Sequence, residues 1–89
     1  MDAINTVGVI SKPGVPAARE VVPSLLAWLR ARSITPRIDE ATAQYVGEPG
    51  RPRAEVPEGC QFVIVLGGDG TLLGAARAIG DRGIPLFAV

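Results

Sequence analysis

The sequence sets a single acidic residue inside a glycine-rich turn. The stretch FVIVLGGDGTLLGAAR, residues 62–77, passes from an apolar run into the turn GGDGT at residues 67–71. Glycines have no Cβ, so the backbone around Asp69 can turn sharply and let a bulky anionic group approach closely. Gly70 allows a positive φ directly after the acid, and a helix that begins at Thr71 would offer free amides and a favourable dipole to a phosphate. These residue types indicate an anion-binding turn that carries one carboxylate.

A second interpretation assigns Asp69 to the fold alone. An aspartate between glycines suits a tight turn, and it can cap a helix that runs from Gly70 onward. A cap needs only one acid and no glycine on its far side, so the three glycines favour a functional role. Gly74 lies inside the helical pattern at a cost of about 1 kcal/mol relative to alanine. We expect that this cost reflects close packing of the helix on the sheet.

Strand-like and helical patterns alternate along the chain and position this turn. Short apolar segments predict strands over residues 6–10, 34–38, 61–66 and 84–89. Helical patterns cover residues 17–32, 39–46 and 71–83. Asp39 is the expected cap of the second helix, Gly83 is the expected stop of the third, and Pro36 favours an edge position for its strand. The fold class is therefore α/β, with a mostly parallel sheet flanked by helices. Ligands bind beyond the carboxyl ends of such strands, where GGDGT lies.

The apolar positions of the two longer helices predict which faces pack on the sheet. The first helix is expected to bury Val21, Val22, Leu25, Leu26 and Leu29. The later helix is expected to bury Leu72, Leu73, Ala76 and Ile79. Trp28 is also expected to pack on the sheet. Pro23 has no amide for the carbonyl of Arg19, so we expect a kink there or a helix whose regular part starts near it.

The stretch GEPGRPRAEVPEG, residues 47–59, is expected to be a weakly packed, mobile loop. It holds three prolines, three glycines and five charged residues, with little apolar content. Arg51 and Arg53 could contact a phosphate there, but a solvated role suits their surroundings better. Rapid exchange of the backbone amides of this stretch is the expected consequence.

Composition excludes several classes of function. Nine basic and nine acidic residues cancel, so no strong field draws this chain to nucleic acid or to an anionic membrane. The longest uncharged run, residues 59–68, is too short to span a bilayer. With no histidine and one cysteine, a transition-metal site is not expected. The lone Cys60 and the lack of an apolar signal region near Asp2 indicate a cytoplasmic protein.

The turn and its neighbours resemble one family of kinases. GGDGT at a strand end resembles the signature shared by NAD kinases, diacylglycerol and sphingosine kinases, and 6-phosphofructokinases. GGDGTLLGAAR followed by GIPLFAV is similar to the NAD kinase form, and VGVISKPG suits the NAD kinase opening. The Asn-Glu-Val-like continuation of lipid kinases is absent after Thr71. The resemblance covers essentially the whole chain, is strong over residues 62–89 and loose over 33–59, and implies a Rossmann-like sheet.

The resemblance implies an activity and its site residues. NAD kinases phosphorylate the 2′-hydroxyl of the adenosine ribose of NAD with ATP or polyphosphate, and they form NADP. Asp69 matches the aspartate that takes the proton of that hydroxyl, and Asp69 with Gly70 matches the pair that contacts NAD. Gly67, Gly68 and Thr71 complete the substrate-binding turn. Some members carry a ligand-contacting basic residue at the position of Gly74, and this sequence does not. Mg²⁺ or another divalent cation is expected to arrive on the nucleotide phosphates, with no metal ligand from this chain.

The family pattern also implies that residues 1–89 are a partial N-terminal α/β domain. The family's GxxGFL segment, its Asn-Glu pair and its C-terminal β-rich NAD-binding domain do not occur in these residues. We therefore expect the chain to be inactive alone and the full-length enzyme to form a homo-oligomer. Two alternatives stay open: a lipid or sugar kinase of the wider superfamily, and a non-catalytic nucleotide-binding module.

Overall fold

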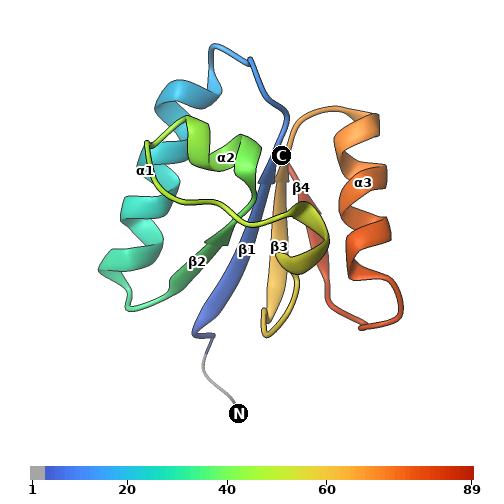
Figure 1. Cartoon of the computed structure of the whole chain (residues 1–89). Helices are drawn as coiled ribbons and strands as arrows, with labels where there is room; N and C mark the ends of the chain where they lie inside the picture. The colour runs from blue at the N-terminus through green and yellow to red at the C-terminus, as the bar shows by residue number, and fades with distance from the viewer. Residues whose placement is uncertain (1–3) are drawn as a thin grey trace.

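A computed structural model describes residues 4–89 as a four-stranded parallel sheet with helices on both faces (Figure 1). The elements are β1 (Thr6–Ser11), α1 (Ala18–Ala31), β2 (Thr35–Ile38), α2 (Glu40–Gln44), the 3₁₀ turn η1 (Arg53–Glu55), β3 (Phe62–Leu66), α3 (Asp69–Ile79) and β4 (Leu86–Ala88). The strand order is β2-β1-β3-β4, and every neighbouring pair is parallel. The predicted α/β class is confirmed, and so is the edge position of β2, which contains Pro36.

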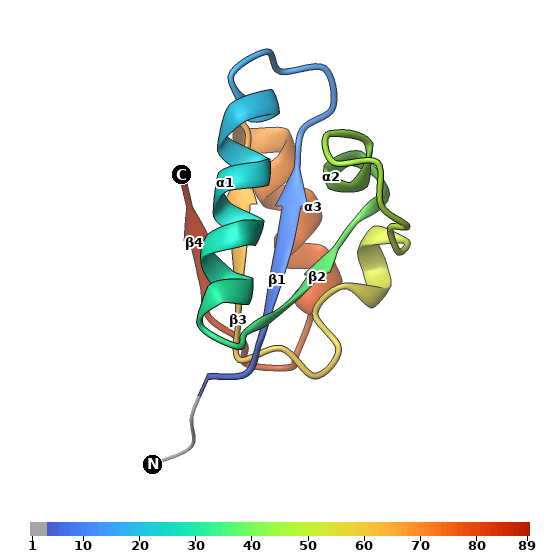
Figure 2. The same cartoon turned by 90° about the vertical axis from the view of Figure 1, so that its left-hand side faces the viewer.

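The two faces of the sheet carry separate apolar clusters, because successive side chains of a strand point to opposite faces. On β1, Val7 and Val9 pack under α1, whereas Ile10 belongs to the cluster under α3. On β3, Val63 and Val65 likewise belong to the α3 cluster. Figure 2 shows α1 in front of the strands and α3 behind them. A sheet covered in this way has both faces of its central strands buried, which explains their continuous apolar runs.

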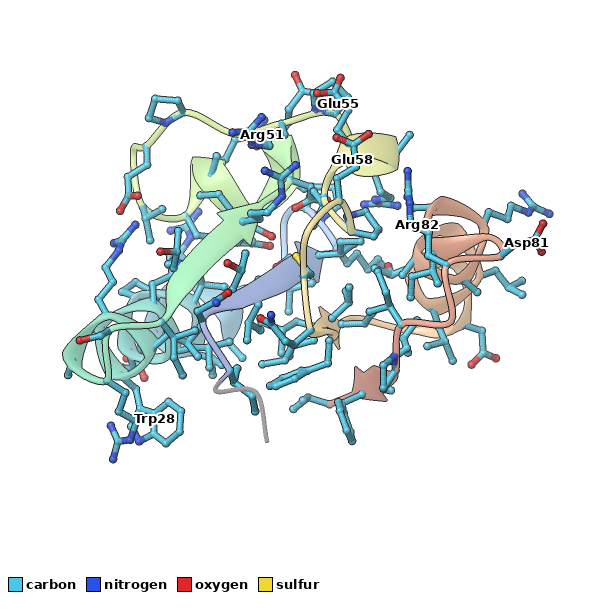
Figure 3. All side chains as sticks on the ribbon, turned by 90° about the horizontal axis from the view of Figure 1, so that it is seen from below. Trp28, Arg51, Glu55, Glu58, Asp81 and Arg82 are labelled. Atoms are coloured by element: carbon cyan, nitrogen blue, oxygen red, sulfur yellow. The ribbon has the colours of Figure 1, made fainter. Side chains whose placement is uncertain are left out.

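Helix α1 follows the predicted range but buries fewer of the predicted side chains. Val22, Leu26 and Leu29 are buried, and they follow one stripe at helical spacing. Trp28 lies about 200° around the helix from Leu26. Its side chain is 52% exposed and projects away from the sheet (Figure 3). The expectation that Trp28 packs on the sheet is therefore wrong. The guanidinium of Arg32 lies over its ring instead, 3.8 Å from the centroid.

The start of α1 also differs from its prediction. The helix begins at Ala18 and runs through Pro23, so the expected later start is wrong. The amides of Glu20 and Val21 already bond to the carbonyl of Ala17, which establishes the helical turn before the proline. Pro23 then removes one hydrogen bond, to the carbonyl of Arg19, close to the helix start, where little of the helix precedes the proline.

Helix α3 begins earlier and ends earlier than its pattern predicts. It starts at Asp69 rather than at Thr71, and it ends at Ile79. Gly80, with φ of 56°, occupies the C-cap, so the expected stop at Gly83 is wrong. The buried stripe is Thr71, Ala75 and Ile79. Leu73 is 58% exposed and Ala76 is also exposed, which contradicts the predicted face.

The segment between α2 and β3 is packed rather than loose. Val56 is fully buried in the cluster under α3, and its Cγ1 would lie 2.9 Å from a Cβ placed on Gly8. The side chain of Arg37 donates to the carbonyl oxygens of Val56 and Glu55, at 3.0 and 2.6 Å. The expectation of weak packing over residues 47–59 is therefore wrong at this point. Composition could not show that one valine fills the space left by a glycine on β1.

A paired substitution measures how much this segment contributes to stability. Val56→Ala removes two fully buried methyl groups, so the free energy of unfolding should fall by about 2 kcal/mol. The matched change Val21→Ala removes the same atoms from an exposed site on α1, and should stay within about 0.5 kcal/mol of the wild type. Urea unfolding followed by circular dichroism measures both. Equal changes in the free energy of unfolding would mean that the segment between α2 and β3 does not pack in solution.

Candidate functional site

The strand order creates a point at the centre of the sheet where two connections diverge. The chain leaves β1 through α1 toward β2, and it leaves β3 through α3 toward β4 on the other side. The carboxyl ends of β1 and β3 lie at the upper edge of the sheet in Figure 1. Ligands of open α/β sheets bind in the crevice at such a point. The backbone amide of Lys12, just after β1, donates to the carbonyl of Leu66 at 2.8 Å. This bond holds the loop after β1 beside the GGDGT turn.

Gly67 is required by the packing of this turn. A Cβ at Gly67 would lie 2.7 Å from Oγ1 of Thr71 and 3.0 Å from Cβ of Lys12. Real side chains do not approach so closely, so any larger residue would push the turn away from the loop after β1. Thr71 is buried beneath the turn, where it supports Gly67. Its predicted contact with substrate stays a prediction.

Gly68 and Gly70 are different, because the fold does not need them. A Cβ placed on either residue would have no heavy atom within 4 Å. Gly68 has φ of −91°, which any residue can adopt, and Gly70 lies within α3. Both residues are exposed and flank Asp69. Their missing side chains leave open surface on each side of the carboxylate, which no heavy atom of the described chain fills.

Asp69 is exposed and is the first residue of α3. The cap position belongs to Gly68, with no capping hydrogen bond from a side chain. The interpretation of Asp69 as a helix cap is therefore wrong. Within residues 4–89 no hydrogen bond or ion pair engages its carboxylate. A carboxylate at a helix N-terminus is stabilised by the helix dipole while its oxygens stay available.

A buried polar cluster lies at the same edge of the sheet, next to this turn. Asp39, at the end of β2, is 2% exposed and accepts from the amide of Thr42 at 2.9 Å, which confirms it as the cap of α2. Arg53 donates to Oδ2 of Asp39 from Nε and Nη2, both at 3.2 Å. Nη2 of Arg53 also lies 3.2 Å from the carbonyl oxygen of Ser11, at the end of β1. Burial of Asp39 is therefore compensated by a charged partner and by a backbone amide.

Sequence reasoning missed the role of Arg53, for which solvation was the favoured interpretation. No local pattern could have paired it with Asp39, because fourteen residues separate them. The guanidinium also contacts α3, since a Cβ on Gly74 would lie 3.0 Å from Nη1 of Arg53. The expected close approach at Gly74 is therefore present, but it is made to this arginine and not to the sheet.

Other reactive groups do not contribute to the site. Cys60 is buried, and its thiol lies 3.1 Å from the carbonyl oxygen of Val56. Burial raises the pKa of the Cys60 thiol, and the nearby charge of Arg37 offsets only part of that rise. A protonated, enclosed thiol is a poor nucleophile.

In the part of the chain that the structure describes, histidine, cysteine and acidic residues form no group of three that could hold a metal ion. No helix within residues 4–89 is long and apolar enough to cross a membrane.

Substitution by alanine should have opposite effects on stability at Gly67, which meets occupied space, and at Gly70, which does not. Gly67→Ala should lower the free energy of unfolding by about 1–3 kcal/mol, because its Cβ overlaps Thr71 and Lys12. Gly70→Ala meets open space inside a helix and should raise stability by about 0.5–1 kcal/mol. Thermal unfolding of the two variants beside the wild type measures both. A loss of stability in Gly70→Ala would show that the fold does need that glycine.

Comparisons with known proteins agree with this geometry. The model of the ATP-NAD kinase N-terminal domain matches residues 7–89. The NAD kinase of Solibacter usitatus is 61% identical over 90 residues, which is 100% of this chain and 31% of the relative. The NAD kinase of Acidobacterium capsulatum is 45% identical over 88 residues, covering 97% of this chain and 31% of the relative. The chain thus spans about a third of the length of these curated relatives.

A solved structure shares the fold. The crystal structure of yeast NADH kinase complexed with NADH superposes with a TM-score of 0.76 at 20% identity. The likeness covers 98% of this chain and 31% of the yeast chain. At this identity the structural likeness supports the fold, and the family model and the bacterial relatives supply the family. On that ground, this chain belongs to the NAD kinase family, whose N-terminal domain it matches.

Proposed function

We propose that this chain supplies the catalytic turn of an enzyme that phosphorylates NAD to NADP. The observation that carries the proposal is the exposed carboxylate of Asp69, which lies between two glycines that the fold does not require. The fold alone gives no reason for this arrangement. A substrate hydroxyl at Asp69, with bulky neighbouring groups against Gly68 and Gly70, gives one. The family membership of the chain supports NAD as that substrate.

The reaction joins the 2′-oxygen of the adenosine ribose to the terminal phosphorus of ATP or polyphosphate. The bond from that phosphorus to its bridging oxygen breaks, and the shortened donor leaves with the electron pair. The proton of the 2′-hydroxyl passes to the carboxylate of Asp69. Because an ordinary aspartate is a weak base, Asp69 orients the hydroxyl first and takes its proton late in the transfer. Phosphoryl transfer depends mainly on such positioning and on charge compensation.

The phosphates of the donor need positive charge near the turn. Lys12 is exposed, directly follows β1 and lies beside Gly67, so it is our candidate for contacting them. Sequence reasoning did not single it out, although a basic residue directly after a central strand was a usable signal. We expect the divalent cation, which neutralises charge on the transferred group, to be bound by the phosphates of the nucleotide. The carboxylates within residues 4–89 form no cluster that would hold it independently.

The proposal is tested by grafting these residues onto a relative. In the graft, residues 1–89 replace the matching segment of the Solibacter usitatus NAD kinase, to which the chain is 61% identical. We expect the graft to form NADP from NAD with ATP or polyphosphate. NAD binding without NADP formation would support a non-catalytic nucleotide-binding module instead. The homo-oligomeric state and the cytoplasmic location stay predictions.

The 89-residue chain alone should show no measurable NADP formation. Its turn contacts only one side of a bound NAD, and positioning of reactants can account for roughly 7–11 kcal/mol of a barrier. The assay compares the chain with the graft at equal concentration, using an enzymatic detection specific for NADP. Comparable rates would show that residues 1–89 contain the whole site.

Removing the carboxylate should separate catalysis from folding. Asp69→Asn in the graft should lower kcat by about 10²–10⁴-fold, the usual range for loss of a general base. The free energy of unfolding should fall by no more than about 1 kcal/mol, because the carboxylate has no side-chain partner within residues 4–89 and loses only its interaction with the helix dipole. The matched control is Asp81→Asn, a loss of the same charge just beyond the opposite end of α3 (Figure 3). Near-wild-type turnover of Asp69→Asn would remove Asp69 from the mechanism.

A further inference from the structure

We propose that Arg53 is a positioning residue, which holds α3 and therefore Asp69 in place against the carboxyl ends of β1 and β2. This inference rests on the proposed function of Asp69. Arg53 contacts three elements that are distant in sequence: Ser11 on β1, Asp39 after β2, and Gly74 on α3. Each of these contacts lies at or near the edge of the sheet that carries the GGDGT turn.

The guanidinium is held in a fixed orientation on its sheet side. Two of its N–H groups converge on Oδ2 of Asp39, and Oδ1 of the same carboxylate is occupied by the amide and hydroxyl of Thr42, at 2.9 and 2.5 Å. Asp39 is almost fully buried, so it cannot turn away to another partner. A planar guanidinium that donates to a carboxylate from two nitrogens has little rotational freedom.

On its other side, Arg53 lies against α3 at Gly74, where the helix has no side chain. Glycine inside a helix costs about 1 kcal/mol relative to alanine. At Gly74 the absence of a Cβ allows Arg53 to approach closely, with Nη1 and Cδ at 3.0 and 3.6 Å from the position of that missing atom. Gly74, for which the sequence predicted close packing on the sheet, is therefore accounted for by this contact with Arg53. Below it, Val56 packs with Ala75 and Ile79, which joins the same segment to α3 by apolar contact.

The contact bears on Asp69 because no hydrogen bond or ion pair within residues 4–89 fixes its side chain. Its carboxylate has no partner within residues 4–89, so its position is that of the backbone at the start of α3. Gly74 is five residues further along the same helix, about 7.5 Å at 1.5 Å per residue. A shift of α3 at Gly74 is therefore transmitted to Asp69. Misplacement of a reacting group by about 1 Å can lower a rate by about 100-fold.

The first test uses kinetics of the graft. Arg53→Lys keeps the charge but cannot donate from two nitrogens of one plane, and we expect kcat to fall by about 10–100-fold with KM for NAD within about twofold. In the Asp69→Asn background the same change should cause no further loss, because an effect that acts through Asp69 disappears with it. Arg51→Lys, an equal change at an exposed neighbour, is the matched control. An equal loss in both backgrounds would overturn the proposal.

Gly74→Ala separates positioning from stability. Its Cβ would lie 3.0 Å from Nη1 of Arg53, which would have to move by a few tenths of an ångström, yet alanine favours the helix by about 1 kcal/mol. We expect an unchanged or raised thermal midpoint together with a lower kcat. If Arg53 only stabilised the fold, kcat would not fall in a variant whose thermal midpoint is unchanged or raised. Wild-type kcat in this variant would overturn the proposal.

Hydrogen exchange tests the role of Arg53 without any measurement of activity, and therefore independently of the proposed function. The amide of Leu72 bonds to the carbonyl of Gly68 at 3.0 Å and reports on the first turn of α3. In the 89-residue chain, Arg53→Lys should accelerate hydrogen exchange of this amide several-fold, while Arg51→Lys should not. An inactive wild-type graft would count against the proposed function alone. Unchanged exchange at Leu72 would overturn the role of Arg53, whatever the activity of the graft.

Discussion

The parallel pairing of β1 with β3 places both the helices and the GGDGT turn. Its register sets Val7 opposite Phe62 and Ser11 opposite Leu66, so both strands end at the same level. Because α1 and α3 leave these two ends in opposite directions, each covers one face of the sheet (Figures 1 and 2). The same divergence leaves open backbone at the centre of the carboxyl edge. A change in this register would separate the loop after β1 from the GGDGT turn.

The glycines of the turn divide into one that the protein needs and two that it does not. Gly67 lets the turn pack against Lys12 and Thr71, and any larger residue there meets occupied space. Gly68 and Gly70 face open space at backbone angles that other residues tolerate. A residue that costs conformational freedom and gains nothing in the fold indicates a requirement from outside the fold. The two glycines beside Asp69 are therefore the residues of GGDGT that the packing of the described chain leaves unexplained.

The polar cluster under this edge is stabilising only as a complete set. Asp39 is buried with Arg53 and Thr42 as partners, both of which also donate to Ser11, and no buried side-chain polar atom within residues 4–89 lacks a hydrogen bond. Removing Arg53 would leave the buried charge of Asp39 without its charged partner, which costs more than the pair contributes. Such a cluster specifies one arrangement of the elements around it. It fixes the ends of β1 and β2 and the path of η1, and it leaves the carboxylate of Asp69 outside the set.

Local periodicity and a contiguous motif were enough to predict the α/β class, the parallel sheet, the edge position of β2, the capping by Asp39 and the family. The folded structure was needed to show that Trp28 points to solvent, that Val56 is core and that Gly80 ends α3. It also decided that Arg53 pairs with Asp39 and lies against Gly74. These outcomes depend on which residues meet after the strands pair, and no periodicity records contacts between residues distant along the chain.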